Sequence, residues 1–520
     1  MSTQRPAGAG AGRILFVSSN GTGLGHLTRS MAIARRLERL EPLFLTLSGA
    51  APVVRGQGFP VEYVASYTTP GAGSDWRWSR RLRGRLRAVF AEASPDVVVF
   101  DGAHPYQGLI DALGAARGAR RVWCRRPMWR PGSNRGALAR ERFFDAVLEP
   151  GEFAAEEDRG PTVERRHGAR VVAPIVFCDD ADLLPREQAA RELGLDPGAS
   201  CVLVNLGQGP EVRALAERCV ERLAGRDGVQ VAVLSSAIAA GLDVPDGVVH
   251  LRATYPVSRY FRAIDAAVAA AGYNAYHELI RFAVPSLFVP MARQTDDQAA
   301  RARFAERTGV GLALAAGDDP DRALEELLDP GRRARISERL AQMRPANGAA
   351  EAAAWLEELA AAEAGPRVAA SRFGKYLRSP VRSLRAAAPF AARAPVHAAA
   401  LAKQTIQRRP PRTVVLALGV EPEAVEAAVA DVLERTPDPP ERVLVVTDTL
   451  ELGALRRLGV GHEHLPAPDD AQAALSGAPY QDFARRRLEL ILAERPRPRR
   501  VLAAGDRGRE LLAGFGTLSR

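Results

Sequence analysis

The stretch best suited to chemistry is a glycine-rich turn followed by a histidine, SNGTGLGHLTRS at residues 19–30. It lies between an apolar run that predicts a buried strand and a pattern typical of a helix. Such a turn brings backbone N–H groups close to a phosphate, and the start of the helix adds a favourable dipole. His26 has an ordinary pKa of about 6.5, which suits a general base, and the helix start favours the neutral ring. The alternative is a histidine that only caps the helix or packs in the core.

The two common nucleotide-binding motifs do not fit this turn. Its glycines stand at positions 21, 23 and 25, and His26 takes the place of the third glycine of a dinucleotide loop. The second predicted strand ends in Ser48-Gly49, where that motif needs an acidic residue for a ribose hydroxyl. The lysine of a P-loop is missing as well. The turn alone therefore predicts either a phosphate site or a tight structural turn.

A second stretch, AAAGYNAYHELIRFAVPSLFVPMARQTDDQAARA at residues 269–302, adds a binding pattern. A strand ends at Gly272 and a helix starts near Asn274, where exposed N–H groups favour a diphosphate. Glu278 lies one turn later on the same face, where a carboxylate would grip both hydroxyls of a ribose. The loop after the next strand offers a carboxylate and an amide to a polyhydroxylated ligand, from Asp297 and Gln298. Each of these residues alone could also be a surface helix residue or a helix cap.

Alternating strands and helices must position these residues. In the first part, apolar runs predict strands at 13–18, 42–49, 96–100 and 120–124, and a helix at 27–40. A second series predicts strands at 201–207, 229–236, 266–272 and 285–290, with helices at 211–224 and 273–282. A third predicts strands at 412–419, 442–449 and 499–506. This alternation predicts an α/β fold with parallel sheets, and the domain boundaries that we expect are 1–178, 179–365, 366–411 and 412–520.

The turn with His26, a second glycine turn LGQGP at residues 206–210 and the 269–302 stretch together resemble the GT-B glycosyltransferases. The resemblance is to the MurG-like branch, which transfers N-acetylglucosamine from a UDP-sugar, and it covers about residues 13–360. It implies two facing Rossmann-like domains, the first on the acceptor side and the second binding the nucleotide sugar. A basic linker at residues 366–411 and a third, small α/β domain at residues 412–520 would follow these two domains.

On this resemblance the second domain holds most of the donor. The residues implied at the diphosphate are Gly272, Tyr273 and Asn274, with the glycine turns supplying Gly23, Gly25, Gly207 and Gly209. Glu278 would bind the ribose, and Gln298 with Asp297 would bind the sugar. The loop at Thr254-Tyr255 would present its backbone to the base, and His26 would face both the diphosphate and the acceptor.

The implied reaction moves a hexosyl unit, with N-acetylglucosamine or a related sugar expected, to a hydroxyl group with inversion. His26 would remove the hydroxyl proton, while backbone N–H groups would stabilise the departing diphosphate. We expect no metal and no cofactor besides the UDP-sugar co-substrate, because backbone dipoles would stabilise the diphosphate in place of a metal ion. Asp101 and His104 in FDGAHPY are a second acid–base pair that would assist His26 or contact the acceptor. We assign Asp101 to catalysis and His104 to the acceptor side.

The acceptor side is predicted from two arginine- and tryptophan-rich stretches. Residues 74–90 hold six arginines with Trp76 and Trp78, and residues 123–135 hold Trp129. We place Trp76 and Trp129 on the acceptor side, where this composition suits an anionic membrane interface and a lipid-linked or cell-envelope acceptor. The alternative is a solvated arginine face with packed tryptophans.

Charge is unevenly distributed along the chain. The net charge is +10, and residues 366–412 carry eleven Lys/Arg and no acidic residue, so this segment accounts for the whole excess. It favours an anionic membrane surface, with a flexible basic linker as the alternative. Nucleic acid is not an expected partner, because no nucleic-acid-binding motif accompanies the charge.

Length and composition set the remaining limits. With 520 residues the chain predicts two to four domains, and no apolar run approaches the ~20 residues of a membrane helix. The N-terminus lacks the apolar core of a signal peptide, and four scattered cysteines predict reduced thiols. We therefore expect a cytoplasmic protein, with a peripheral position on the inner face of the plasma membrane left open.

Two other functions remain open from the sequence. One is a UDP-sugar 2-epimerase of the same fold, and the other is a non-catalytic nucleotide-sugar-binding protein. Residues 412–520 indicate no function. His462-Glu463-His464 resembles a pair of metal-binding histidines. Two histidines separated by one residue, without a third ligand, are however usually structural.

Overall fold

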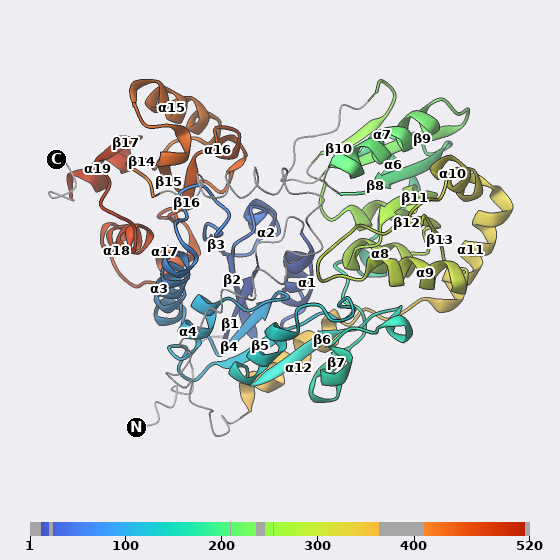
Figure 1. Cartoon of the computed structure of the whole chain (residues 1–520), viewed down its shortest axis with the longest axis horizontal. Helices are drawn as coiled ribbons and strands as arrows, with labels where there is room; N and C mark the ends of the chain where they lie inside the picture. The colour runs from blue at the N-terminus through green and yellow to red at the C-terminus, as the bar shows by residue number, and fades with distance from the viewer. Residues whose placement is uncertain are drawn as a thin grey trace. The chain divides into compact units, whose positions relative to one another are not determined.

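The computed structural model describes residues 12–19, 24–207, 210–235, 245–252, 254–362 and 410–514 (Figure 1). They belong to two compact units. The first comprises Met1–Pro42, Val97–His104 and Arg120–Ala362, and the second comprises Leu43–Asp96, Pro105–Ala119 and Glu363–Arg520. These units divide the residues differently from the domain boundaries predicted above.

The first unit contains a parallel sheet whose strands are mostly apolar and buried, except for the partly exposed strand β7 at its edge. Its strands lie side by side in the order β1 (Gly12–Ser18), β4 (Val97–Asp101), β5 (Arg120–Cys124), β6 (Ala146–Pro150) and β7 (Arg170–Val172). Helix α1 (Gly25–Ala34) follows β1. Because Ser18 and Asp101 are paired in the register of β1 and β4, the start of α1 and the end of β4 meet at the carboxyl edge of the sheet.

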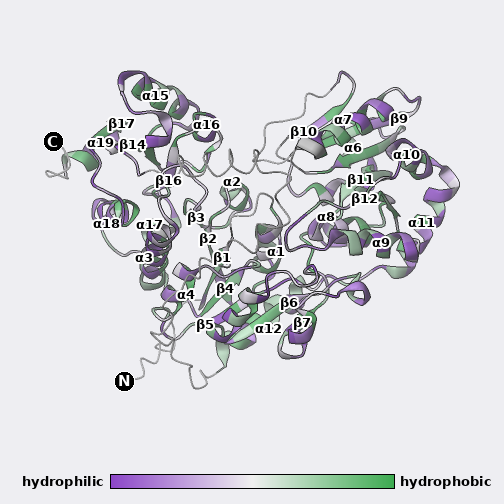
Figure 2. Cartoon of the chain, in the orientation of Figure 1, coloured by the Kyte–Doolittle hydropathy of each residue, from purple (hydrophilic) through white to green (hydrophobic). Residues whose placement is uncertain are grey.

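The same unit contains a second parallel sheet. Its strand order is β10 (Val249–Arg252), β9 (Val229–Ser235), β8 (Ser200–Asn205), β11 (Ala266–Ala270), β12 (Ser286–Val289) and β13 (Leu312–Ala313). The chain changes direction between β8 and β11, and ligands of open α/β sheets bind at such a point, beyond the carboxyl ends of the strands. Figure 2 shows these strands as mainly apolar and the helices beside them as mixed, as expected for a covered sheet.

In the described part of the chain, six helices belong to the region of the second sheet. They are α6 (Arg186–Leu193), α7 (Pro210–Ala224), α8 (Tyr273–Arg281), α9 (Gln298–Thr308), α10 (Pro320–Leu328) and α11 (Pro330–Met343). Short helical turns connect the elements of this unit: α5 (Arg135–Leu138), η1 (Ala139–Phe143), η2 (Ala155–Glu157), η3 (Val163–Gly168), η4 (Asp180–Asp182) and η5 (Val257–Ala263).

Helix α12 (Ala349–Ala361) follows the second series but packs with the first sheet, against α1, β4 and β7 (Figure 1). Glu357 on α12 accepts hydrogen bonds from the backbone N–H groups of Glu38, at 2.7 Å, and Arg39, at 2.5 Å. The two sheets of this unit are therefore linked twice along the chain, before β8 and after α11.

The second unit combines two distant parts of the sequence. From the first part come the parallel pair of β2 (Leu40–Thr46) and β3 (Val61–Tyr63) with α2 (Ala51–Gly56), α3 (Asp75–Ala93) and α4 (Gln107–Leu113). From the second come the parallel strands β16 (Gly461–His464), β15 (Val443–Thr447), β14 (Thr413–Ala417) and β17 (Arg500–Ala504), in that order. Their helices are α15 (Pro422–Arg435), η7 (Pro440–Arg442), α16 (Gly453–Arg457), α17 (Ala471–Ala474), α18 (Tyr480–Leu492) and α19 (Asp506–Ala513).

Buried ion pairs join these two parts of the second unit. Arg487 of α18 lies 2.7 Å from Glu92 of α3 and 3.3 Å from Glu62 of β3. Arg85 of α3 donates from Nε to Glu62 at 2.9 Å, and from Nη2 to the carbonyl of His464 at 3.0 Å. A small parallel sheet with helices between its strands is thus present where the sequence predicts one, but a separate third domain is not confirmed.

The structure corrects the interpretation of residues 74–90 as a membrane-interface surface. Trp78 is buried and donates its indole N–H to the carbonyl of Ala65 at 2.8 Å, and Arg81 and Arg85 are buried as well. Much of the stretch is therefore the packed inner face of α3, held by α4 and α18. Trp76 is half exposed, and the guanidinium groups of Arg77 and Arg80 lie over its ring.

The predicted α/β class with parallel sheets is confirmed, and every predicted strand is present within a few residues. The helix predicted at 27–40 is wrong at its end, because α1 stops at Ala34 and the chain turns into β2. None of the helices in the described ranges is long and apolar enough to cross a membrane. The basic segment 366–411 lies outside the described residues, apart from its last two positions, 410 and 411.

Candidate active site

His26 and Asp101 form a hydrogen-bonded pair at the carboxyl edge of the first sheet. His26 is the second residue of α1, and Asp101 is the last residue of β4. The distance from Nδ1 of His26 to Oδ1 of Asp101 is 2.6 Å. Asp101 is buried, whereas the His26 side chain is 21% exposed, so the ring remains open to solvent on one side. This is the arrangement of a general base whose ring is oriented by a carboxylate.

Burial and neighbouring charges set the ionisation of the pair. Burial alone would raise the pKa of Asp101, but Arg29 and His26 outweigh it and hold this pKa below its ordinary value. Burial lowers the pKa of His26, Arg29 and Arg126 add to that effect, and Asp101 opposes it. The favoured state is therefore an ionised carboxylate beside a neutral ring. Because the carboxylate can only accept, Nδ1 carries the ring proton and Nε2 is left unprotonated.

The sequence predicted Asp101 in a pair with His104, and the structure pairs Asp101 with His26 instead. His104 lies three residues beyond β4, at the surface, and its side chain hydrogen-bonds with Asn134. The sequence did not single out Arg29, which is buried on α1 and contacts both oxygens of Asp101. Its position three residues after His26 on a predicted helix was the only available signal.

The start of α8 contributes the second half of the site. Gly272 is its N-cap residue, and among the described residues no side chain caps the first turn. Asn274 donates from Nδ2 to the carbonyl of Gly25 at a long 3.4 Å, so the first turns of α8 and α1 lie against each other. Oδ1 of Asn274 is buried and has no hydrogen-bond partner among the described residues. Two helix starts and the His26–Asp101 pair thus converge, which suits an anion.

Tyr273 is predicted at the diphosphate, and its side chain is buried between parts of the first unit. Its hydroxyl donates to the carbonyl of Gly151 at 2.9 Å and accepts from the N–H of Ile175 at 3.1 Å. Arg29 lies over one side of the ring, 5.1 Å from its centre. Tyr273 therefore supports the site with its buried side chain. Its backbone N–H takes no part in these side-chain contacts.

Glu278, predicted to bind ribose, lies one turn further along α8 and is buried. The N–H of Phe177 hydrogen-bonds to its carboxylate, and the hydroxyl of Ser258 donates to Oε1 at 3.4 Å. Burial raises the pKa of Glu278 to about 7, although these hydrogen bonds oppose the rise. Tyr255 lies in the same region, where it donates to Thr28 at 3.3 Å and packs against Phe177. Thr254 is half-buried beside it.

The predicted sugar-binding residues have partners within the protein. Asp297 is the N-cap of α9 and accepts from the N–H of Ala300 at 3.1 Å. Gln298 accepts from the N–H of Met291 and donates to Asp296, both at 3.0 Å. Asp296, which the sequence treated only as a helix cap, instead pairs with Arg126 and with Arg301 at 2.7 Å. Arg126 and Arg301 were missed, because nothing in their sequence context separates them from other arginines.

The remaining predicted residues are placed as follows. Gly25 opens α1, and a Cβ added there would meet no atom of the described residues within 4 Å. Gly207 follows β8 in a left-handed conformation with φ of +84°, which glycine adopts without strain. Gly23 and Gly209 lie outside the described residues. Trp129 is buried at 1% exposure against Trp123, so its side chain offers no surface to an acceptor. Trp76 belongs to the other compact unit.

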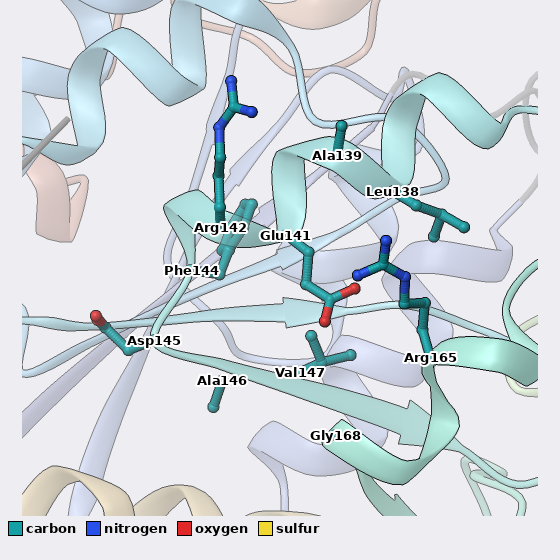
Figure 3. Close-up of a pocket in the computed structure, with 10 residues that line it drawn as sticks. All are labelled: Leu138, Ala139, Glu141, Arg142, Phe144, Asp145, Ala146, Val147, Arg165 and Gly168. Carbon is teal, nitrogen blue, oxygen red and sulfur yellow. The ribbon is translucent and has the colours of Figure 1, made fainter. Parts of the chain in front are cut away.

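A cavity of about 400 Å³ opens elsewhere in the first unit, near the amino-terminal end of β6. Figure 3 shows Glu141 and Arg165 pointing toward one another across it, and Glu141 also accepts from Arg125 at 2.9 Å. None of the predicted site residues lines this cavity.

Within the described ranges, no group of three or more His, Cys, Asp or Glu side chains is arranged to hold a metal ion. His462 and His464 are buried on β16, and burial lowers their pKa values to about 4 and about 3. His462 stacks on Tyr63, and Glu463 pairs with Arg495 at 2.8 Å, so this motif packs inside the second unit.

No family model matches the chain, and no curated protein matches it. Solved glycosyltransferase structures are similar to it at low sequence identity. The spinosyn forosaminyltransferase SpnP is 18% identical with a TM-score of 0.48, and the kitacinnamycin glycosyltransferase is 19% identical with a TM-score of 0.47. MurG of Acinetobacter baumannii is 15% identical with a TM-score of 0.45. Each match covers 67% of this chain and 99% of the other.

Proposed function

We propose that this protein is an inverting glycosyltransferase that moves a hexosyl unit from a nucleoside diphosphate sugar to a hydroxyl acceptor. One observation carries the proposal: the His26–Asp101 pair lies where the first turns of α1 and α8 meet. A base for the attacking hydroxyl and an anion site for the leaving diphosphate are thereby next to each other. This juxtaposition is what displacement at an anomeric carbon requires.

In the proposed reaction, Nε2 of His26 accepts the proton of the acceptor hydroxyl. The acceptor oxygen forms a bond to the anomeric carbon, and the bond from that carbon to the diphosphate oxygen breaks. The electron pair leaves with the diphosphate, whose negative charge is stabilised by the N–H groups at the start of α8. Asp101 stabilises the protonated ring that forms on His26. Attack opposite to the leaving group inverts the anomeric configuration.

The donor proposed is a UDP-sugar, with N-acetylglucosamine or a related sugar transferred. Support comes from the line of groups beyond the diphosphate site, where Glu278 lies one helical turn from Asn274 on α8. The carboxylate would accept two ribose hydroxyls, and the Asp297–Gln298 loop would contact the sugar. The positive ends of two helices supply the charge stabilisation, so the mechanism proposed does not call for a metal ion.

The acceptor proposed is a hydroxyl compound, and a lipid-linked acceptor of the cell envelope is its finer form. Because most of α3 is packed, support for a membrane-facing surface now rests on exposed Trp76 with Arg77 and Arg80. Acceptor assays therefore need both water-soluble and lipid-linked hydroxyl compounds.

The test is release of the nucleoside diphosphate from a panel of uridine and thymidine diphosphate sugars, with His26→Ala as the variant. We expect the variant to lose roughly 10²- to 10⁴-fold in turnover, since a general base contributes about that much. Donor binding, followed by calorimetry, should remain. His167→Ala is the matched control, because His167 is an exposed histidine of η3. Turnover of His26→Ala within a fewfold of the wild type would exclude His26 as the base.

A further inference from the structure

Arg29 occupies the space directly behind the His26–Asp101 pair. It lies on α1, one turn after His26, and only 2% of its surface is exposed. Nε donates to Oδ2 of Asp101 at 3.1 Å, and Nη2 donates to Oδ1 at 2.6 Å. This two-point contact matches the planar fork of a guanidinium to the two oxygens of a carboxylate, so it fixes the rotation of the Asp101 side chain.

The same guanidinium also limits the state of the His26 ring. Nη2 of Arg29 lies 3.0 Å from Nδ1 of His26, and Oδ1 of Asp101 lies 2.6 Å from the same nitrogen. A guanidinium only donates, so its contact with a protonated Nδ1 is not a hydrogen bond, and the shorter contact with the Asp101 carboxylate decides that Nδ1 carries the proton. Since Arg29 keeps Asp101 ionised, the proton of the neutral ring is held on Nδ1, where the carboxylate accepts it.

The groups that face His26 come from several elements. Asp101 ends β4, Arg29 is on α1, and Arg126 follows β5 and lowers the pKa of His26 from that side. Cys124, the last residue of β5, contacts Asp101 and Arg29, and burial raises the pKa of its thiol. Tyr273 of α8 lies over the guanidinium of Arg29, and burial raises the pKa of its hydroxyl. Near neutral pH the charged neighbours are thus one carboxylate and two arginines.

We propose that Arg29 is a positioning residue for the base: it holds the Asp101 carboxylate so that His26 keeps its proton on Nδ1 and presents an unprotonated Nε2. Its ring contact with Tyr273 extends this role to the start of α8, which ties the base to the element that would bind the leaving group. The proposal rests on the proposed function for its catalytic meaning, but the ionisation of His26 can be measured without turnover.

Two substitutions separate the charge of Arg29 from its shape. Arg29→Met removes the positive charge that disfavours protonation of His26, so we expect the pKa of His26 to rise by about one unit. Arg29→Lys keeps the charge but loses the planar fork, so we expect this pKa to change little. In the lysine variant, Asp101 is free to rotate, and the ring should exchange between its two neutral tautomers.

The direct measurement is NMR titration of the protein with ¹⁵N-labelled histidine. Eight histidines are present, and His26→Gln assigns the signal of interest. Ring ¹⁵N shifts report both the pKa and the protonated nitrogen. The matched control is Arg121→Met, because Arg121 grips Asp145 at two points in the same sheet but at the amino-terminal part of β5. The control should leave the His26 titration unchanged.

Kinetics supply the second readout. In the wild type, kcat/KM should fall on the acid side as His26 is protonated, and Arg29→Met should move this limb to higher pH by about one unit. Arg29→Lys should keep the limb in place and lower the plateau about 10-fold.

Two results would overturn the proposal: a His26 titration and tautomer in Arg29→Met identical to the wild type, or a shift of the same size in Arg121→Met. If Arg29→Met does not fold, a wild-type tautomer and plateau in Arg29→Lys overturn it equally. Absence of turnover with every donor, together with the expected NMR changes, would instead count against the proposed function alone.

Discussion

Glu278 has an ionisation that is measurable whatever the donor proves to be. Burial places its pKa at about 7, above the ordinary value of 4.5, so the native state binds this proton more tightly than the unfolded chain does. The stability from the protonated group is complete below about pH 4.5 and is lost as the pH rises through about 7. The free protein is therefore less stable against unfolding when Glu278 is a carboxylate, which is the form that would accept ribose hydroxyls.

We expect Glu278→Gln to increase the free energy of unfolding at pH 8, by on the order of 2–3 kcal/mol relative to the wild type. The difference should disappear near pH 4.5, where the wild-type side chain is already neutral. Urea unfolding at both pH values measures it. Glu306→Gln, at an exposed position of α9, should change stability by less than about 0.5 kcal/mol at either pH. A gain of equal size at both pH values would contradict a raised pKa.

Among single residues, the sequence identified those whose residue type is unusual for their place in a strand or turn. A histidine in a glycine turn and an acidic residue at a strand end predicted His26 and Asp101, and their contact follows from the parallel register of β1 and β4. It did not identify Arg29, Arg126 or Arg301. Their roles depend on burial against carboxylates from other elements, and the chain has many arginines that look alike in sequence.

Helix α9 begins with a residue that has two candidate roles. Asp297 caps the helix by accepting from the N–H of Ala300, and its carboxylate is also a candidate contact for the donor sugar. A serine at this position keeps the capping oxygen but removes the charge. The two roles can therefore be separated by substitution.

We expect Asp297→Ala to lose about 1 kcal/mol of stability and Asp297→Ser to lose only a few tenths, because serine is a good N-cap residue. Both variants should bind the donor about 10-fold more weakly, because each loses a charged hydrogen-bond acceptor. Thermal unfolding and donor calorimetry measure the two effects. Full donor affinity in Asp297→Ser would show that Asp297 acts only as a cap.

Elements with a strong apolar pattern could be predicted, and the others could not. The strands β1, β4, β8 and β12 are short, mainly apolar runs, and their predicted positions match within two residues. Strand β16 was missed, because GHEH carries no hydrophobic pattern. Its polar side chains find partners in a distant part of the sequence, and no local signal contains that information. For the same reason α3 was taken for a surface helix although its arginines are partly internal.

The stability of the second unit depends on charged side chains that are buried together as ion pairs. Glu62, Arg85 and Arg487 are each no more than 2% exposed at their side chains. Burial alone would raise the pKa of Glu62, but Arg487 and Arg85 outweigh it and hold this pKa low. Removing one residue of a buried ion pair leaves the charge of its partner buried without an opposite charge. This lowers the free energy of unfolding more than the loss of a surface ion pair does.

We expect Arg487→Met to destabilise the second unit by about 3–5 kcal/mol. Hydrogen exchange should show the loss in both α3 and α18, although they are far apart in sequence. Arg435→Met is the matched control, since Arg435 pairs with Asp431 on an exposed surface of α15 and should matter by less than about 1 kcal/mol. A stability of Arg487→Met equal to that of the control would mean that the buried network contributes little.

The contact between Arg487 and Glu92 spans 395 residues of chain, and this has a consequence for biosynthesis. At about 5–20 residues per second, a ribosome needs roughly 20–80 seconds to make the intervening sequence. During that interval helix α3 has emerged while its partners in α18 do not yet exist. Glu92 and Arg85, whose partners Arg487 and His464 are made late, must therefore wait in water or with a chaperone, so the yield of folded protein should depend on the order and speed of translation.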